Sequence, residues 1–224
     1  MIPYIDLHTH GNVRKNDEIK VFNLLLNESS DIPLLPFSAG LHPWYADQLS
    51  VDDLSKRLNQ CLQSPDLFAI GETGLDKVCK TALNLQLDIF ECQLKIASEN
   101  NLPVIIHCVR AWEELIEISG NYHSTKILHG YQGGVQLTER LLKKGFCFSI
   151  GKAILNSGSA IQSSIHLIPK TSLFCETDTS VVSIKEIYEK ICAILKLHEE
   201  DLRKTIFENY KKLKVKVERL KDKG

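Results

Sequence analysis

Residues 67–107 read LFAIGETGLDKVCKTALNLQLDIFECQLKIASENNLPVIIH, and this stretch decides the fold. It opens with an apolar run, Leu67–Glu72, and closes with another, Pro103–His107. Between them, apolar residues from Leu83 to Ala97 recur at spacings of three and four. Two short apolar runs on either side of an amphipathic helix are typical of parallel strands joined by a crossover helix. The stretch therefore predicts a parallel α/β fold.

The rest of the chain repeats this pattern. Eight apolar runs qualify as strands, which is the number that a (β/α)8 TIM-like barrel requires. They are Tyr4–His8, Val21–Leu26, Phe37–His42, Leu67–Glu72, Pro103–His107, Lys126–His129, Phe146–Ile150 and Leu173–Asp178.

The connections between these strands are uneven. Ser50, Thr81 and Ser183 precede helical patterns, and we interpret them as helix N-caps. In contrast, the loops that separate the first three strands are barely long enough for a crossover with its helix. We therefore expect an irregular barrel, with outer helices missing between strands 1 and 3.

The bulk composition sets limits on the class of protein. A chain of 224 residues, with 43% hydrophobic and 25% charged residues, fits one soluble domain spanning 1–224. The formal net charge of −1 argues against a tight non-specific nucleic-acid binder. A nucleic-acid substrate stays open, because a local patch or a metal cluster can hold phosphate.

The sequence also suggests where the protein works. No apolar run approaches the roughly 20 residues that a membrane span needs, and residues 1–10 have no secretory signal pattern. The seven cysteines are scattered and never form a CxxC motif. We expect a reduced, cytoplasmic protein with no membrane association, and no obligate protein partner is evident.

Five of the predicted strands end in a histidine or a carboxylate, at His8, Glu72, His107, His129 and Asp178. The carboxyl ends of parallel barrel strands meet at one rim, where active sites lie. One such residue alone is more often structural than a ligand, but five at one rim need a positive charge to hold them. The pattern therefore predicts a metal site, and its ligand types favour Zn, Mn or Mg.

His10 adds a sixth candidate. Residues i and i+2 on a strand point to the same side, so His8 and His10 can grip one ion. A lone HxH motif is weak evidence for a metal site. Here it counts because other predicted strands also end in histidines or carboxylates.

Six motifs occur in a fixed order along the chain: DLHTH (6–10), GLHPW (40–44), IGETGLD (70–76), LPVIIHCVRA (102–111), ILHGYQGG (127–134) and CETD (175–178). Together they resemble the TatD family of metal-dependent hydrolases, amidohydrolase-like barrels that include deoxyribonucleases. The resemblance runs from residue 4 to about residue 210.

The resemblance implies a set of residue roles. Of two divalent ions, one would be held by His8, His10 and Asp178, and the other by His107 and His129. Glu72 would bridge the two ions.

Further roles follow from the same resemblance and from side-chain chemistry. Asp178 would also accept the proton of the attacking water as a general base. His42 matches a position that faces substrate phosphate. Arg110 is placed to reach phosphate, and pairing with a nearby acid is an equally open interpretation. Asp76 is expected to orient a ligand or to close the turn in which it lies. Glu176 precedes Asp178 by two positions, so we expect it to share the strand face of Asp178 and to orient a ligand.

The nearby thiol is a weaker candidate. Cys108 follows His107 directly, which invites a thiol-nucleophile hypothesis. Alternation along the strand points the two side chains in opposite directions, so we expect Cys108 to be buried.

Two loops depart from the family pattern. Thr179–Val182 replaces the usual Ser-Pro sequence after the last acid, and Gly130–Gly134 replaces the usual aromatic-Ser-Gly. Both belong to the substrate side of the site, so they affect substrate identity more than metal binding.

The leading hypothesis is an ester hydrolase that uses a water activated by two metal ions, with DNA or a small phosphoester as substrate. A metal-dependent amidase or deacylase on the same barrel is the first alternative, because the ligands alone do not distinguish carbon from phosphorus. A non-catalytic metal-binding protein is the second.

Overall fold

Eight parallel strands follow one another through a single sheet in chain order. The structure is a computed structural model that describes residues 2–11, 16–29 and 31–221, with side chains up to residue 214. The strands are β1 (Tyr4–Thr9), β2 (Glu18–Leu25), β3 (Phe37–Gly40), β4 (Leu67–Asp76), β5 (Val104–Val109), β6 (Lys126–Leu128), β7 (Cys147–Ile150) and β8 (Leu173–Cys175). All eight predicted strands are confirmed, although β4 runs four residues further than predicted and β8 ends three residues earlier.

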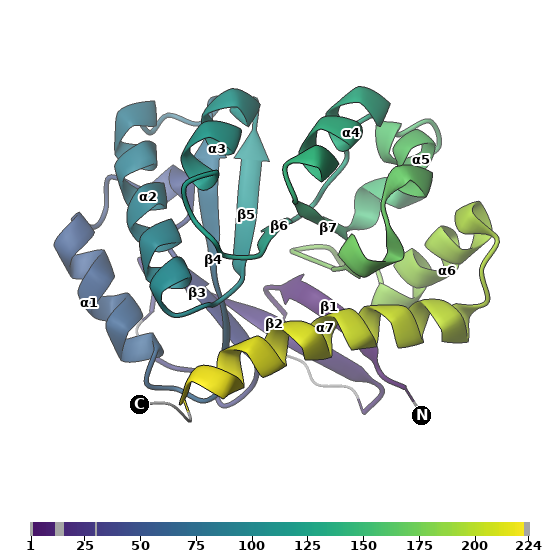
Figure 1. Cartoon of the computed structure of the whole chain (residues 1–224), viewed down its shortest axis with the longest axis horizontal. Coiled ribbons are helices and arrows are strands. Elements are labelled where there is room, and N and C mark those ends of the chain that lie inside the picture. The colour runs from purple at the N-terminus through teal and green to yellow at the C-terminus, as the bar shows by residue number, and fades with distance from the viewer. Residues whose placement is uncertain (1, 12–15, 30, 222–224) are drawn as a thin grey trace. The chain divides into compact units, whose positions relative to one another are not determined.

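Helices follow most of the strands from β3 onward (Figure 1). The α-helices are α1 (Val51–Cys61), α2 (Leu83–Glu99), α3 (Trp112–Ser119), α4 (Val135–Lys143), α5 (Ala160–Ser164), α6 (Ile184–Leu195) and α7 (Glu199–Lys221). Short 3-10 helices are η1 (Pro43–Tyr45), η2 (Lys152–Leu155), η3 (Ile165–Leu167) and η4 (Lys170–Ser172). Among the described residues no helix lies between β1 and β2 or between β2 and β3, which confirms the expected gap in the outer layer.

The chain divides into two compact units. Unit 1 contains residues 1–22 and 127–215, and unit 2 contains residues 23–126 and 216–224. Both β2 and β6 cross the boundary, so each unit includes part of these strands. The prediction of a single domain over 1–224 stays a prediction.

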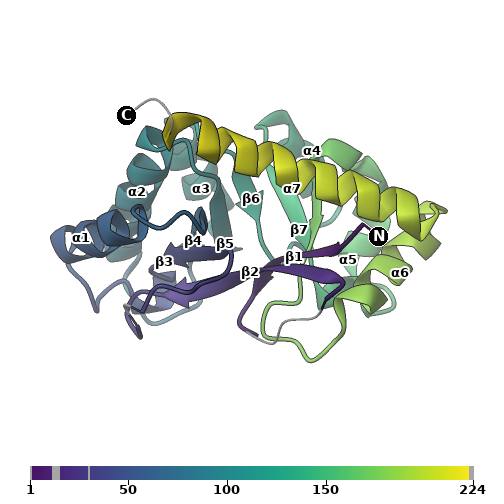
Figure 2. The same cartoon turned by 90° about the horizontal axis from the view of Figure 1, so that it is seen from below.

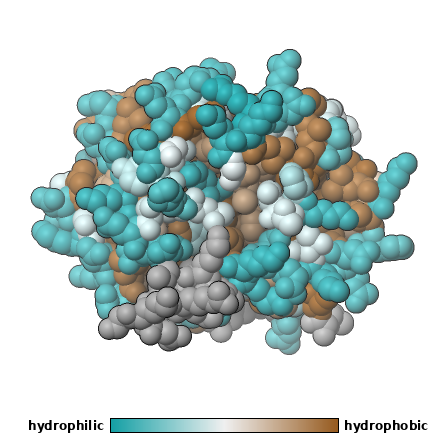
Figure 3. Space-filling model, viewed as in Figure 1, coloured by the Kyte–Doolittle hydropathy of each residue, from teal (hydrophilic) through white to brown (hydrophobic). Residues whose placement is uncertain are grey.

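Unit 2 is built on the parallel pairs β3–β4 and β4–β5. Helix α2 packs against β4, with α1 and α3 beside it (Figure 1), and buries Ile89, Phe90 and Leu94. The surface over these helices in Figure 3 is mainly hydrophilic, as expected for helices with one apolar face.

Two local features shape unit 2. The predicted cap at Thr81 was wrong, because Ala82 is the N-cap of α2 and makes no side-chain cap bond. The Thr81 hydroxyl donates instead to the carbonyl of Trp44, at 2.8 Å. Gly74 has a φ of +139°, and a Cβ there would lie 1.9 Å from the carbonyl oxygen of His107. Glycine thus allows β4 and β5 to approach closely beside the site.

Unit 1 joins the first strand to the last. β1 pairs with β2, β6 with β7 and β7 with β8, all in parallel, and a parallel bridge between Thr9 and Asp178 connects the ends of β1 and β8. The sheet thus returns to its first strand in this unit, as in a barrel.

Helices α6 and α7 lie beside β1, and α6 packs against it (Figure 2). Ser183 caps α6 in a capping box with Glu186, as the sequence predicted for the cap. The Tyr188 hydroxyl bonds the backbone of Ile5, and the Tyr4 hydroxyl donates to Glu199 at the start of α7. None of the described helices is both long enough and apolar enough to cross a membrane.

Candidate metal centre

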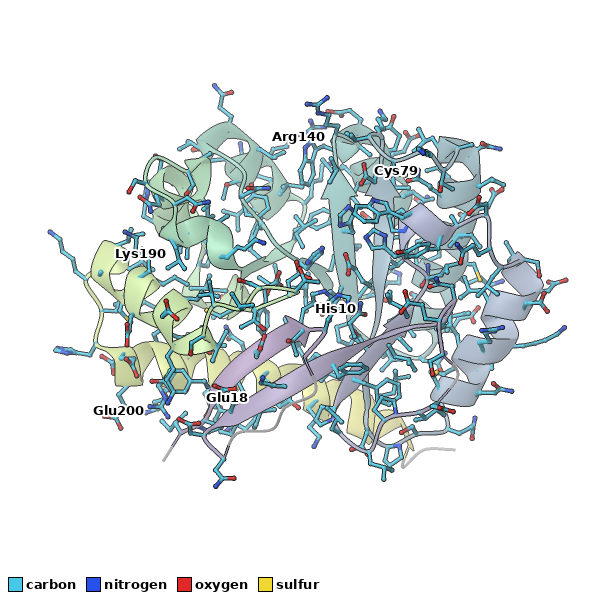
Figure 4. The ribbon with its side chains drawn as sticks, turned by 180° about the vertical axis from the view of Figure 1, so that it is seen from behind. His10, Glu18, Cys79, Arg140, Lys190 and Glu200 are labelled. Atoms are coloured by element: carbon cyan, nitrogen blue, oxygen red, sulfur yellow. The ribbon has the colours of Figure 1, made fainter. Side chains whose placement is uncertain are left out.

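In unit 1, the carboxyl ends of β1 and β8 gather two histidines around one carboxylate. Asp178 Oδ1 lies 3.8 Å from His8 Nε2 and 3.5 Å from His10 Nε2. The His8 side chain is fully buried, whereas the side chains of His10 and Asp178 are about one third exposed. Figure 4 shows His10 past the carboxyl end of β1, with Glu18 at the opposite end of the β1–β2 pair.

Backbone contacts fix Asp178 against β1. Its N–H donates to the His8 carbonyl at 2.9 Å, and its own carbonyl accepts from His10 N at 3.2 Å. Asp178 has a φ of +53°, in the left-handed region that Asp and Asn tolerate better than most residues. β8 has already ended at Cys175, and in this conformation the carboxylate of Asp178 lies within 3.8 Å of both imidazoles.

A buried acid supports the same corner. Asp6 accepts hydrogen bonds from Thr177 N at 2.8 Å and from the Thr177 hydroxyl at 2.7 Å. That hydroxyl also lies 2.9 Å from the hydroxyl of Thr9. Burial raises the pKa of the Asp6 carboxyl to about 6, although both hydrogen bonds from Thr177 oppose the rise. Asp6 therefore ties β1 to the residue that precedes Asp178.

His129, which follows β6, completes the unit 1 group. Ligand atoms of His8, His129 and Asp178 all lie within 4.8 Å of one another. His129 Nδ1 is 3.2 Å from Glu176 Oε1, and the same oxygen accepts from Gly130 N at 2.5 Å. A carboxylate on Nδ1 leaves Nε2 of the ring to act as the ligand.

In unit 2, a second group surrounds Glu72. His42 Nε2 and His107 Nδ1 are each 3.2 Å from Glu72 Oε1. Ligand atoms of the three residues lie within 4.8 Å of one another, and the side chains are buried or nearly so. His42 was predicted to face substrate phosphate, and in the structure it contacts Glu72 as closely as His107 does.

Asp76 holds the other side of His107. Its Oδ2 is 3.2 Å from His107 Nε2 and accepts from Trp44 Nε1 at 2.7 Å. Burial acts to raise the pKa of the Asp76 carboxyl, but hydrogen bonds from Trp44, Val78 N and His107 outweigh it and lower the pKa. Asp76 thus contacts a candidate ligand through Oδ2, and its Oδ1 accepts from Val78 N within the turn that follows, so its contacts fit both predicted roles.

Both groups fit a divalent ion. Bonds of 2.0–2.2 Å in a tetrahedral site place neighbouring ligand atoms about 3.4 Å apart. The distances from Asp178 to His8 and His10 and from Glu72 to His42 and His107 run from 3.2 to 3.8 Å, and the other ligand atoms of each group lie within 4.8 Å. Imidazole and carboxylate donors suit Zn, Mn or Mg, so the chemistry of the donor set agrees with the spacing.

Other predicted residues fall outside these groups. Arg110 is exposed, has a φ of +55° and makes no hydrogen bond or ion pair with the described residues, which disfavours pairing with an acid. Burial raises the pKa of the Cys108 thiol to about 12, which disfavours a thiolate nucleophile. The remaining histidines, at 123, 166 and 198, are exposed.

A pocket of about 620 Å³ opens beside His10 and Asp178 within unit 1. Its wall includes residues 179–183, most of which belong to the loop that departs from the family pattern. The altered loop therefore lines space next to candidate ligands, as expected for a loop that affects substrate identity.

Sequence reasoning missed three residues that shape the groups. Asp6 precedes His8 by two positions on the same strand face, and this alternation was an available signal. Thr177 and Trp44 carried no such signal, because their partners are distant in sequence.

Comparisons with known proteins identify the family of the chain. Residues 11–214 match the family model described as TatD related DNase. The chain belongs to the TatD family. It is 32% identical over 161 residues to the human 3'-5' RNA nuclease TATDN2, covering 68% of this chain and 21% of that protein. It is 26% identical over 192 residues to an uncharacterized metal-dependent hydrolase, YabD, of Bacillus subtilis, covering 78% and 75% of the two chains.

The structural comparison supports the fold. The crystal structure of YJJV, a TatD homolog from Escherichia coli, superposes with a TM-score of 0.81 at 21% identity, covering 95% of this chain and 98% of that one. This likeness confirms the predicted (β/α)8 barrel. The chain spans about half the length, or less, of the first curated relatives that it matches.

Proposed function

We propose that the chain is a divalent-metal-dependent hydrolase that cuts phosphoester bonds in DNA, RNA or a small phosphoester. The observation that carries the proposal is the group of His8, His129 and Asp178, whose ligand atoms lie within 4.8 Å of one another at the strand ends of a TatD-family chain. The names of relatives, a nuclease and a metal-dependent hydrolase, support the same reaction class.

We propose the ligand assignment that the resemblance to the TatD family implies. One ion is held by His8, His10 and Asp178, a second by His107 and His129, and Glu72 bridges the two. The contacts of Asp178 with both histidines of the HxH motif support the first set. The contact of Glu72 with His107 supports part of the second.

A bound divalent ion lowers the pKa of water, polarises the ester and stabilises the leaving oxygen. The protein residues position and move the proton. Asp178, whose side chain is one third exposed, accepts the proton of the attacking water. Glu176 and Asp76 hold His129 and His107 in fixed orientations. Arg110 neutralises a phosphate oxygen, and its freedom from ion pairs among the described residues supports this role.

The test is metal content measured together with hydrolysis. Metal-free protein is supplied separately with Zn, Mn or Mg and assayed on single-stranded DNA, RNA, a phosphodiester, a phosphomonoester, a carboxylic ester and an amide. We expect bound metal and phosphoester hydrolysis that a chelator abolishes. Metallated protein that hydrolyses none of the phosphoesters contradicts the proposal, and hydrolysis of the amide alone supports the amidase alternative.

A matched pair of variants tests the catalytic role of Asp178. Asp178→Asn should lower the hydrolysis rate at least 100-fold, because the amide cannot accept the proton. Asp88→Asn makes the same change at an exposed position on α2 and should leave the rate unchanged. Equal rates for the two variants would exclude Asp178 as the base.

A further inference from the structure

Trp44 combines high exposure with a firmly fixed position. The residue ends the GLHPW motif, two positions after His42, and is 52% exposed. Its neighbours His42 and Asp76 are buried by comparison, at 7% and 3% exposed. A large apolar ring is thus open to solvent directly beside a group of buried candidate ligands.

Three hydrogen bonds hold Trp44 in place. Its backbone N–H donates to His42 Nδ1 at 3.2 Å, and its carbonyl accepts from the Thr81 hydroxyl at 2.8 Å. Its indole N–H donates to Asp76 Oδ2 at 2.7 Å. An exposed side chain fixed in this way has already lost its rotamer freedom, so a ligand that contacts the ring need not meet that entropy cost again.

The indole has no parallel ring against it among the described residues. The imidazole of His42 lies 5.0 Å away, centroid to centroid, at an interplanar angle of 85°. That of His107 lies 6.3 Å away at 77°. Both contacts are T-shaped, so neither imidazole stacks in parallel on the indole.

We propose that Trp44 is a stacking site for an unpaired nucleobase of the substrate, next to the phosphate that is cut. The inference rests on the proposed function, because it is the short distance to His42 and His107 that places the base near the reacting phosphate. A flat, fixed aromatic ring is the general means by which proteins hold single-stranded nucleic acid, and it accepts any base. Bases inside a duplex are covered by their neighbours, so the site selects frayed ends or single strands.

A purely structural role for Trp44 is the competing explanation, because its N–H also holds Asp76. A matched pair of variants separates the two roles. Trp44→Phe and Trp44→Leu both remove the N–H and lose the bond to Asp76 equally. They differ in the aromatic ring, so a difference between them reports on stacking.

The first experiment measures binding without hydrolysis. Fluorescently labelled phosphorothioate oligothymidylate, which resists cleavage, is titrated with metallated protein and followed by anisotropy, beside an abasic oligomer of the same length. Loss of stacking should make Trp44→Leu bind oligothymidylate about 5- to 150-fold more weakly than Trp44→Phe. The abasic oligomer should bind both variants alike. Equal affinities of the two variants for oligothymidylate would overturn the proposal.

A second measurement leaves Trp44 unchanged and so does not depend on the folding of its variants. The chain has two tryptophans, so Trp112→Phe makes Trp44 the sole source of indole fluorescence. Oligothymidylate should quench this fluorescence and the abasic oligomer should not. No quenching, or no binding of oligothymidylate by the unmodified protein, overturns the stacking site.

The two proposals fail separately. Quenching by oligothymidylate without hydrolysis of any phosphoester would contradict the proposed function and retain the base site. Hydrolysis of single-stranded DNA at equal rates by the Phe and Leu variants would retain the function and reject the base site.

Discussion

The carboxylate of Glu176 offers a sharp test of how the protein prepares a metal ligand. Its side chain is fully buried, and Oε1 meets both His129 Nδ1 and Gly130 N, whereas Oε2 is buried without a hydrogen-bond partner among the described residues. Glu176→Gln keeps the shape of the side chain and removes the charge.

The magnitude follows from these contacts. An amide oxygen in the place of Oε1 can still accept both hydrogen bonds, but replacing a charged acceptor by a neutral one costs about 1 kcal/mol. The amide N–H₂ falls where Oε2 was, and a buried donor without a partner costs about 1–3 kcal/mol. We expect the free energy of unfolding of the metal-free protein to fall by about 2–4 kcal/mol.

The effect on metal binding is separate. Without the Glu176 carboxylate beside Nδ1, the His129 ring becomes a weaker ligand for the metal. Loss of such a partner of a ligating histidine lowers metal affinity about 10- to 100-fold. Urea denaturation of metal-free protein measures the stability change, and competition with a chromophoric chelator measures the affinity of the folded protein.

Glu186→Gln is the control. This exposed carboxylate also lies in unit 1 and also accepts from a backbone N–H, that of Ser183, at 3.1 Å. We expect a loss of less than about 1 kcal/mol in stability and no change in metal affinity. If folded Glu176→Gln binds metal as tightly as the unmodified protein, Glu176 does not prepare His129 as a ligand. If its free energy of unfolding is also unchanged, the buried contacts of Glu176 do not stabilise the fold.

Three further predictions concern other residues. Asp6→Ala should lower the free energy of unfolding in urea by about 2–3 kcal/mol, because Thr177 loses two buried hydrogen-bond acceptors; an unchanged value would contradict the clamp. Arg110→Ala should raise the KM for a phosphodiester about tenfold with little change in stability, as measured by initial rates and thermal melting; an unchanged KM would remove Arg110 from substrate binding. Cys108→Ser should retain the hydrolysis rate, and iodoacetamide at pH 8 should leave Cys108 unmodified by mass spectrometry, since a thiol pKa of about 12 leaves almost no thiolate; a large loss of rate would revive the thiol hypothesis.

The strands and their ends could be predicted because their signals are local. An apolar run that stops at a histidine or carboxylate needs no knowledge of distant residues, and the eight predicted strands are all present. The gap in the outer helices could also be predicted, since the connections before β3 are barely long enough for a crossover with its helix.

The misjudged details depend on distant partners. Thr81 has the chemistry of an N-cap, but its hydroxyl is taken by Trp44, 37 residues earlier. Glu176 was expected to orient a ligand on the strand face of Asp178, but β8 ends at Cys175, and the candidate ligand that Glu176 contacts is His129. The clamp between Asp6 and Thr177 spans 171 residues. Such pairings follow from the tertiary fold and leave no periodic trace.

The left-handed backbone at Asp178 has a consequence for evolution. At a φ of +53°, most side chains cost about 1–2 kcal/mol, whereas Asp and Asn are tolerated and glycine is free of the penalty. A lineage that loses its activity can therefore change Asp178 to Asn or Gly with little cost in stability, but other replacements also weaken the fold. Pseudoenzymes descended from this chain should carry Asn or Gly as the fourth residue of the CETD motif, and a survey of that one position would identify them.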